Sequence, residues 1–228
     1  MCLGGHYKFL SLLVLCVFVF TNVSYAGKKP FKGIITYKIT FPNSDFDQAT
    51  LAMMPKVMTV TIKGNMSKTS MNMGMGTQST IFNGDNKTAI TLIDMMGQKY
   101  AIQTSTEDID NEIADQPKPI VKYLDETKEI AGYRCKKAEI IFKNDVDNEV
   151  TFNVYYTDEL GGKALNSGEA LFSEIDGVLL EYEIDAKGMA MKFEATSVEK
   201  KSVSDKEFEV PEGFKITTKD EMESMFGG

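Results

Sequence analysis

Hydrophobic and polar residues alternate with a period of two along most of the chain after residue 30. In residues 33–41 (GIITYKITF), every second side chain from Ile35 to Phe41 is apolar, and those between them are Thr or Lys. Alternation of this kind recurs in residues 57–64, 78–94, 97–103, 133–143, 149–157, 177–185 and 188–200. It is typical of strands with one buried face, and polar turns such as Asn83-Gly84 favour antiparallel hairpins. We therefore expect a mainly β protein with about ten strands.

Helical patterns are few and short. In residues 105–117, Ser105 can cap a helix, Ile109 and Ile113 lie one turn apart, and Pro117 ends the pattern. Residues 165–175 and 218–226 could each form a short helix. Because these helices are too small to cover the apolar side of a flat sheet, the sheet must curl or split into two layers. A curled antiparallel sheet with short helices in its concave face would leave an apolar space, whereas a two-layer sandwich would fill it.

Methionines gather in residues 66–76 (MSKTSMNMGMG), where Met71, Met73 and Met75 are spaced two apart. On a strand these three would share one face, and they would form a soft-metal site, part of the core, or the wall of a cavity. Alternate residues on a flat strand lie about 7 Å apart, which is too far for one Cu(I) ion unless the strand bends. Methionine adapts its shape to varied apolar partners, so we favour the cavity wall, whose residues also serve as core when the cavity is empty. We predict no metal.

The first 26 residues have the pattern of a signal peptide. Residues 9–20 (FLSLLVLCVFVF) form an apolar stretch too short to span a membrane, and Ser-Tyr-Ala precedes Gly27 as a cleavage site. Leu15 stands where a lipidation signal before Cys16 needs a small residue. We therefore expect cleavage after Ala26 and a soluble, exported protein in the periplasm or outside the cell, with residues 27–228 forming one domain.

Composition excludes several classes of function. His6 is the only histidine and lies in the predicted signal peptide, so the exported chain has no Ser-His-Asp, Cys-His or His-containing zinc site. No Gly-rich phosphate-binding loop is present. A formal net charge of −8, without a basic stripe, argues against nucleic-acid binding. We expect no enzyme activity and no cofactor.

Two other features suggest chemistry but favour structural roles. Cys135 is the only cysteine after residue 26, so no internal disulfide is expected, and a lone cysteine on a strand is usually a small buried hydrophobe. Asp145, Asp147 and Glu149 alternate as in a calcium-binding loop, but Val150 occupies the position that needs glycine. A solvated hairpin turn fits this acidic run better.

Five blocks of sequence resemble the domain of unknown function 4412 family of secreted bacterial proteins. They are FKGIITYKITF, MMPKVMTVTIKGNMSKTSMNMGM, ITLIDMMGQKYAI, ETKEIAGYRCKKAEI and MKFEATSVEKKSVSDKEFEVPEGF, and they follow in order from Phe31 toward the C-terminus. The resemblance implies a fold like that of the lipoprotein carriers (LolA/LppX type) of the Gram-negative periplasm. Those relatives are curved antiparallel half-barrels that hold acyl chains on a concave side plugged by helices.

These considerations predict a monomeric binding protein for an acyl chain, a lipidated molecule or another apolar ligand, with a membrane or lipoprotein of the cell envelope as a further partner. The expected cavity lining is Met58, Val60, Ile62, Met71, Met73, Met75, Met189, Met191 and Phe193. The expected lid is Ile109, Ile113, Leu171 and Phe172. Two alternatives stay open, namely a structural or interaction module with a filled core, and a Cu(I)-binding protein that uses the methionines.

Overall fold

The computed structural model describes residues 30–42, 46–143, 148–186, 189–219 and 221–222. Its strands are β1 (Lys32–Thr40), β2 (Val57–Lys63), β3 (Met66–Asn72), β4 (Gly76–Asn83), β5 (Thr88–Met95), β6 (Gln98–Thr104), β7 (Ile120–Ile130), β8 (Tyr133–Lys143), β9 (Glu149–Thr157), β10 (Val178–Ala186), β11 (Met189–Lys200) and β12 (Lys215–Thr218). Its helices are α1 (Gln48–Met53) and α2 (Thr106–Ala114), with 3-10 turns at η1 (Lys163–Asn166) and η2 (Asp205–Phe208). The mainly β fold expected from the alternation is confirmed.

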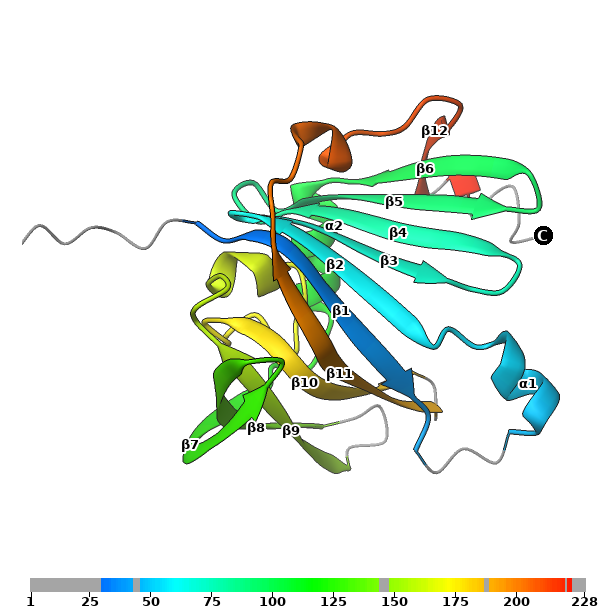
Figure 1. Cartoon of the computed structure of the whole chain (residues 1–228). Coiled ribbons are helices and arrows are strands. Elements are labelled where there is room, and N and C mark those ends of the chain that lie inside the picture. The colour runs from blue at the N-terminus through cyan, green and yellow to red at the C-terminus, as the bar shows by residue number, and fades with distance from the viewer. Residues whose placement is uncertain (1–29, 43–45, 144–147, 187–188, 220, 223–228) are drawn as a thin grey trace, which may run out of the picture.

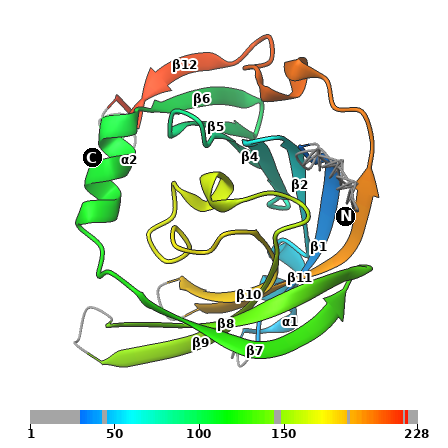
Figure 2. The same cartoon turned by 90° about the vertical axis from the view of Figure 1, so that its left-hand side faces the viewer.

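The described strands form one twelve-stranded sheet in the order β12-β6-β5-β4-β3-β2-β1-β11-β10-β9-β8-β7. All neighbouring strands are antiparallel except β12 and β6, which run parallel. The sheet is strongly curled and does not close, since β12 and β7 are its two edges. Figure 2 looks into the curl and shows α2 between these edges, where it connects β6 to β7. The curl is compatible with the expected half-barrel.

The inner segment, residues 158–177 between β9 and β10, lies inside the curl (Figure 2). It consists mostly of turns, with η1 as its only regular element. The helix expected over residues 165–175 is therefore wrong apart from its first residues. Short helices packed in the concave face are not confirmed, because irregular chain occupies that position. The helix expected over 105–117 is confirmed as α2, whose N-terminus has Ser105 and Asp108 in a capping box. Most of the helix expected over 218–226 lies outside the described residues.

Strand register shows which side chains face inward. One row of paired residues crosses six strands, running Ile35, Val60, Thr69, Thr80, Thr91 and Ile102. Ile35 belongs to the core cluster that contains Leu160 of the inner segment. Phe82 shares the face of this row and lies against Gly168 of the same segment. The row therefore lies on the concave face.

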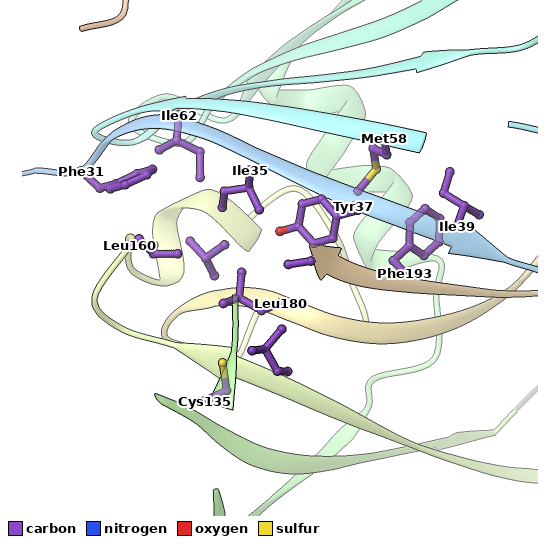
Figure 3. Packing of buried hydrophobic residues seen from close by; sticks show 13 residues of the cluster. Phe31, Ile35, Tyr37, Ile39, Met58, Ile62, Cys135, Leu160, Leu180 and Phe193 are labelled. Atoms are coloured by element: carbon purple, nitrogen blue, oxygen red, sulfur yellow. The ribbon is translucent and has the colours of Figure 1, made fainter. Parts of the chain in front are cut away.

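The inner core lies mainly under β1, β2, β10 and β11. Ile35, Tyr37 and Ile62 are almost completely buried there, together with Leu160 from the inner segment (Figure 3). The Tyr37 hydroxyl donates a hydrogen bond of 2.8 Å to the Leu179 carbonyl, so its polar atom is satisfied within the core. Burial raises the pKa of Tyr37 far above its ordinary value. This part of the concave face is filled by the chain itself.

A second core lies on the outer side of the sheet. Ile81, Leu92 and Ala101 alternate with the inward-facing residues of β4, β5 and β6, yet they are buried. Val203 and Phe208, from the stretch after β11, cover them. The sequence analysis assumed a single apolar face, but these strands also bury apolar side chains on their outer face, while their concave face carries threonines beside apolar residues such as Phe82 and Ile93.

Candidate functional site

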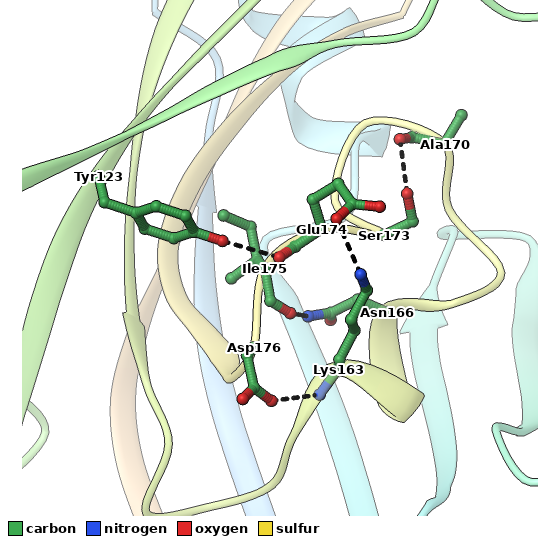
Figure 4. A network of polar contacts seen from close by, with 8 residues as sticks. All are labelled: Tyr123, Lys163, Asn166, Ala170, Ser173, Glu174, Ile175 and Asp176. Atoms are coloured by element: carbon green, nitrogen blue, oxygen red, sulfur yellow. Dashed lines mark hydrogen bonds and ion pairs between the residues drawn. The ribbon is translucent and has the colours of Figure 1, made fainter.

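Hydrogen bonds within the inner segment join residues 163–166 to residues 174–177 (Figure 4). The buried Asn166 side chain donates to the carbonyls of Ile175 and Gly177, each at 2.8 Å. The Lys163 backbone N–H donates to Asp176 at 2.8 Å, and the Lys163 ammonium pairs with Glu174 at 2.8 Å. Because the Asn166 bonds are buried, they fix the loop more firmly than the exposed ion pair.

A further bond connects the inner segment to the sheet. The Tyr123 hydroxyl on β7 donates to the Glu174 carbonyl at 2.8 Å. This hydrogen bond joins the inner segment to the edge strand β7.

Aromatic rings fill the curl between the inner segment and β9 to β11. The Phe172 ring lies edge-on to Phe152 and Tyr182, with centroids 6.1 and 5.5 Å away. Tyr182 stacks on Phe193 at 4.8 Å. Phe172 and Phe193 are buried, so these rings form part of the packed interior of the curl.

The concave face of β3, β4 and β5 is covered less completely. We call Thr69, Met71, Gln78, Thr80, Thr91 and Ile93 the uncovered inner surface, because all six face inward and all keep intermediate exposure. The inner segment reaches this side near Phe82 and Gly84, at the opposite end of β4 from Gln78. Water therefore reaches an inward-facing surface that carries hydroxyl and amide groups beside Met71 and Ile93.

A carboxylate lies where α2, the inner segment and β10 approach one another. The Glu169 side chain is accessible to water but has protein on several sides, and this partial burial raises the pKa of its carboxyl. Repulsion from Glu112 on α2 raises it further. Burial, and then the charge of Glu169, raise the pKa of Tyr182. Because Glu112 also pairs with Lys219 at 2.6 Å, α2 is tied to the chain after β12.

The three methionines spaced two apart do not share a strand face. β3 ends at Asn72, so Met71 faces inward while Met73 and Met75 lie in the turn before β4. Met73 is 36% exposed and Met75 is 62% exposed. The expectation that they share one strand face with Met71 is therefore wrong, because Gly74 adopts φ +78° and turns the chain.

The other predicted lining residues divide into two groups. Met58, Ile62 and Phe193 face inward but are buried by the protein's own side chains. Val60, Met189 and Met191 keep intermediate exposure. Of the predicted lid residues, Ile109 is buried on α2, Ile113 is partly exposed on it, and Leu171 and Phe172 lie within the inner segment. Whether any of them contacts a ligand stays a prediction.

In the part of the chain that the structure describes, two hollows have linings without any predicted lining residue. The first, of about 340 Å³, is lined by Thr151, Phe152, Asn153, Tyr155, Glu181, Tyr182, Glu183 and Lys192. The second, of about 200 Å³, is lined by Pro30, Phe31, Gly64, Asn65, Asp158, Glu159, Gly161 and Gly162. The lining of the first hollow is mostly polar and does not suit an acyl chain, whereas the lining of the second combines apolar and polar surface.

Cys135 adds no reactive group to the site. The Cys135 thiol is completely buried, and burial raises its pKa to about 11. Such a thiol carries little of the reactive thiolate near neutral pH. Asp145 and Asp147 lie outside the described residues, while Glu149 begins β9.

Sequence reasoning missed Asn166 and Glu169. Both lie in a stretch that was expected to be helical, where their side chains would have pointed to solvent. The turn residues of Asn166-Ser167-Gly168 were the available signal, because such a run favours a loop over a helix. No pattern in the sequence shows that this loop lies inside the curl.

Comparisons with known proteins do not identify a family. No protein-family model matches the chain, so the resemblance to the domain of unknown function 4412 family is not confirmed. No curated protein matches either. Among solved structures, a beta-barrel-like protein of domain of unknown function DUF1849 from Brucella abortus is similar, with a TM-score of 0.34 and 9% identity over 77% of this chain and 100% of that chain. A likeness this distant carries no argument about function.

Proposed function

We propose that this protein is an exported, non-enzymatic binding protein that holds an acyl chain or a similar apolar ligand against the uncovered inner surface. The observation that supports the proposal is the exposure of Met71 and Ile93 on the concave face of a curled sheet. An enclosed cavity is not needed, because one side of the ligand would face the water-filled opening. The expected similarity to lipoprotein carriers, which hold acyl chains on a concave sheet face, is part of this proposal.

The energetics favour a partly buried chain. Burying about ten methylenes contributes roughly 0.8 kcal/mol each, and ordering the chain and losing its free motion offset much of this. Half-burial on an open surface therefore leaves a net contribution of only a few kcal/mol, corresponding to a Kd of roughly millimolar. The hydroxyls of Thr69, Thr80 and Thr91 suit a ligand with a polar group along its length better than a simple hydrocarbon.

Charge substitution on the two faces of neighbouring strands tests the site. Met71→Lys places an ammonium on the uncovered inner surface, whereas Thr77→Lys places one on the outer side of β4. We expect binding of a fluorescent fatty acid to weaken at least tenfold in Met71→Lys and to stay unchanged in Thr77→Lys. Equal affinities in the two variants, or no binding by the unsubstituted protein, would refute the proposed site.

Export is tested separately. The proposal expects the secreted or periplasmic protein to begin at Gly27, which N-terminal sequencing or intact mass determines. A cell-associated protein that retains residues 1–26 would contradict it.

A second candidate is a structural or interaction module with a filled core. The buried inner segment, anchored by Asn166 and Tyr123, supports this alternative. Two measurements distinguish the two functions. A module with a filled core would yield no bound lipid when the gently purified protein is extracted, and it would take up no fatty acid, whereas a binding protein would take up fatty acid. The expected monomer is compatible with both and is tested by light scattering.

A further inference from the structure

The turn between β3 and β4 is unusually tight and is rich in methionine. The Met75 N–H donates to the Met73 carbonyl at 2.9 Å across Gly74, whose φ is +78°. This is the geometry of a classic γ-turn. The Met73 N–H donates to the Gly76 carbonyl at 2.8 Å, and the Gly74 N–H donates to the Asn72 side chain at 2.9 Å. The turn therefore brings Met73 and Met75 closer than the roughly 7 Å between alternate residues on a flat strand.

Two more methionines lie against this turn. A methyl group at Gly74 would lie 3.3 Å from the Met53 carbonyl oxygen, so the end of α1 touches the turn. A methyl group at Gly76 would lie 2.7 Å from Cγ of Met95, so the Met95 side chain lies over the base of the turn. Figure 1 shows α1, the β3–β4 turn and the β5–β6 turn at the same end of the molecule. We call Met53, Met73, Met75 and Met95 the methionine rim.

The rim side chains are exposed, which core packing does not explain. Their exposed fractions are 64% for Met53, 36% for Met73, 62% for Met75 and 37% for Met95. Large apolar side chains scattered singly on a surface are ordinary, but here four exposed methionines belong to one turn and the two segments that lie against it. All four end in thioethers, although leucine would serve equally well as an apolar surface residue.

We propose that the methionine rim binds a single Cu(I) ion through three or four thioether sulfurs. Thioethers are soft, uncharged ligands that select Cu(I) over the harder divalent metals. Among the described residues, no group of three or more His, Cys, Asp or Glu side chains is placed to hold a metal, so a borderline or hard ion has no comparable site. On a flat strand Met73 and Met75 would lie about 7 Å apart, too far to bind one ion, and the bend at Gly74 shortens this separation. This site is separate from the uncovered inner surface and does not depend on the function proposed there.

Competition for Cu(I) tests the site. The purified exported protein, with Cys135 changed to alanine to remove its thiol, is titrated anaerobically with Cu(I) against a chromophoric chelator such as bicinchoninate. We expect one Cu(I) per chain, and at least tenfold weaker binding in the double variant Met73→Leu/Met75→Leu.

Met66→Leu is the matched control, because Met66 lies at the opposite end of β3. Its affinity should equal that of the background protein. The proposal is overturned if the background protein takes no Cu(I) from the chelator, if the double variant binds as tightly as the background, or if Met66→Leu weakens binding equally.

A second measurement covers the case in which the double variant does not fold. In the unsubstituted protein labelled at the methionine methyl groups, one equivalent of Ag(I), a stable substitute for Cu(I), should shift the NMR signals of the four rim methionines and leave that of Met66 in place. Shifts spread over all methionines, or no shifts, would overturn the proposal independently of any variant.

Discussion

Asn166→Ala tests whether the inner segment is a fixed part of the fold. The Asn166 side chain is 8% exposed and donates both of its hydrogen bonds to backbone carbonyls, those of Ile175 and Gly177. Alanine removes both donors and leaves two carbonyls without their partners beside a residue, Ile175, that is fully buried. Each unsatisfied group costs about 1–3 kcal/mol, so we expect the two together to lower the free energy of unfolding by about 2–6 kcal/mol.

Urea denaturation of the two proteins measures this loss, and hydrogen exchange locates it. Amide protection should fall in residues 158–177 and at Phe82, which lies against Gly168. Asn65→Ala is the matched control, because the Asn65 side chain makes one exposed hydrogen bond, to Asp85, and its removal should cost less than about 0.5 kcal/mol. If the free energy of unfolding of Asn166→Ala lies within about 0.5 kcal/mol of that of the unsubstituted protein, the Asn166 hydrogen bonds do not anchor the inner segment.

Three other predictions follow from burial and close contacts. The raised pKa of Glu169 means that the folded protein becomes less stable as pH rises through that pKa. Glu169→Gln should therefore be more stable than the unsubstituted protein at pH 7 and should lose this advantage below pH 4.5, the ordinary pKa of the carboxyl. Melting temperatures of the two proteins across this pH range check the prediction. Cys135, with a pKa of about 11, should stay unmodified by a thiol reagent at pH 8 until urea unfolds the protein, as peptide mapping would show. Gly84→Ala places a methyl group 2.2 Å from the Ala164 carbonyl oxygen and should lower the free energy of unfolding more than Gly97→Ala does. A methyl group at Gly97 meets no atom within 4 Å and costs about 1 kcal/mol through the φ of +83°. Equal losses for the two variants in denaturant unfolding would contradict the contact between Gly84 and Ala164.

The alternation of side chains was enough to predict most of the sheet. Strands β1, β2, β8, β9, β10 and β11 follow the expected ranges closely, because apolar and polar residues alternate along most of each strand. The capping signal at Ser105 likewise located the start of α2. β7 was missed because nearly all of its side chains are exposed, and an edge strand of this kind carries little hydrophobic signal.

The candidate site was less predictable, for a geometric reason. Alternation shows that Ile81 and Thr80 point in opposite directions, but it does not show which direction is the inside of the curl. The sequence analysis assumed one apolar face turned inward throughout, whereas Ile81 of β4 and Leu92 of β5 point outward beneath Val203 and Phe208. Burial there depends on contact between segments more than 100 residues apart, which no local pattern records.

The methionine prediction went wrong for a local reason. Treating residues 66–76 as one strand ignored Gly74, which ends the alternation by adopting a positive φ. Met71 stays on the concave face, and Met73 and Met75 move to the rim.

The central claim is that the uncovered inner surface holds an apolar ligand, and photo-crosslinking tests it most directly. A fatty acid carrying a diazirine is bound to the purified protein, irradiated and mapped by peptide mass spectrometry, with excess unlabelled fatty acid as competitor. The account predicts saturable labelling of the β3 and β5 peptides that contain Met71 and Ile93. Labelling that the competitor does not reduce, or that falls only on outer-face peptides such as the one containing Phe208, would contradict it.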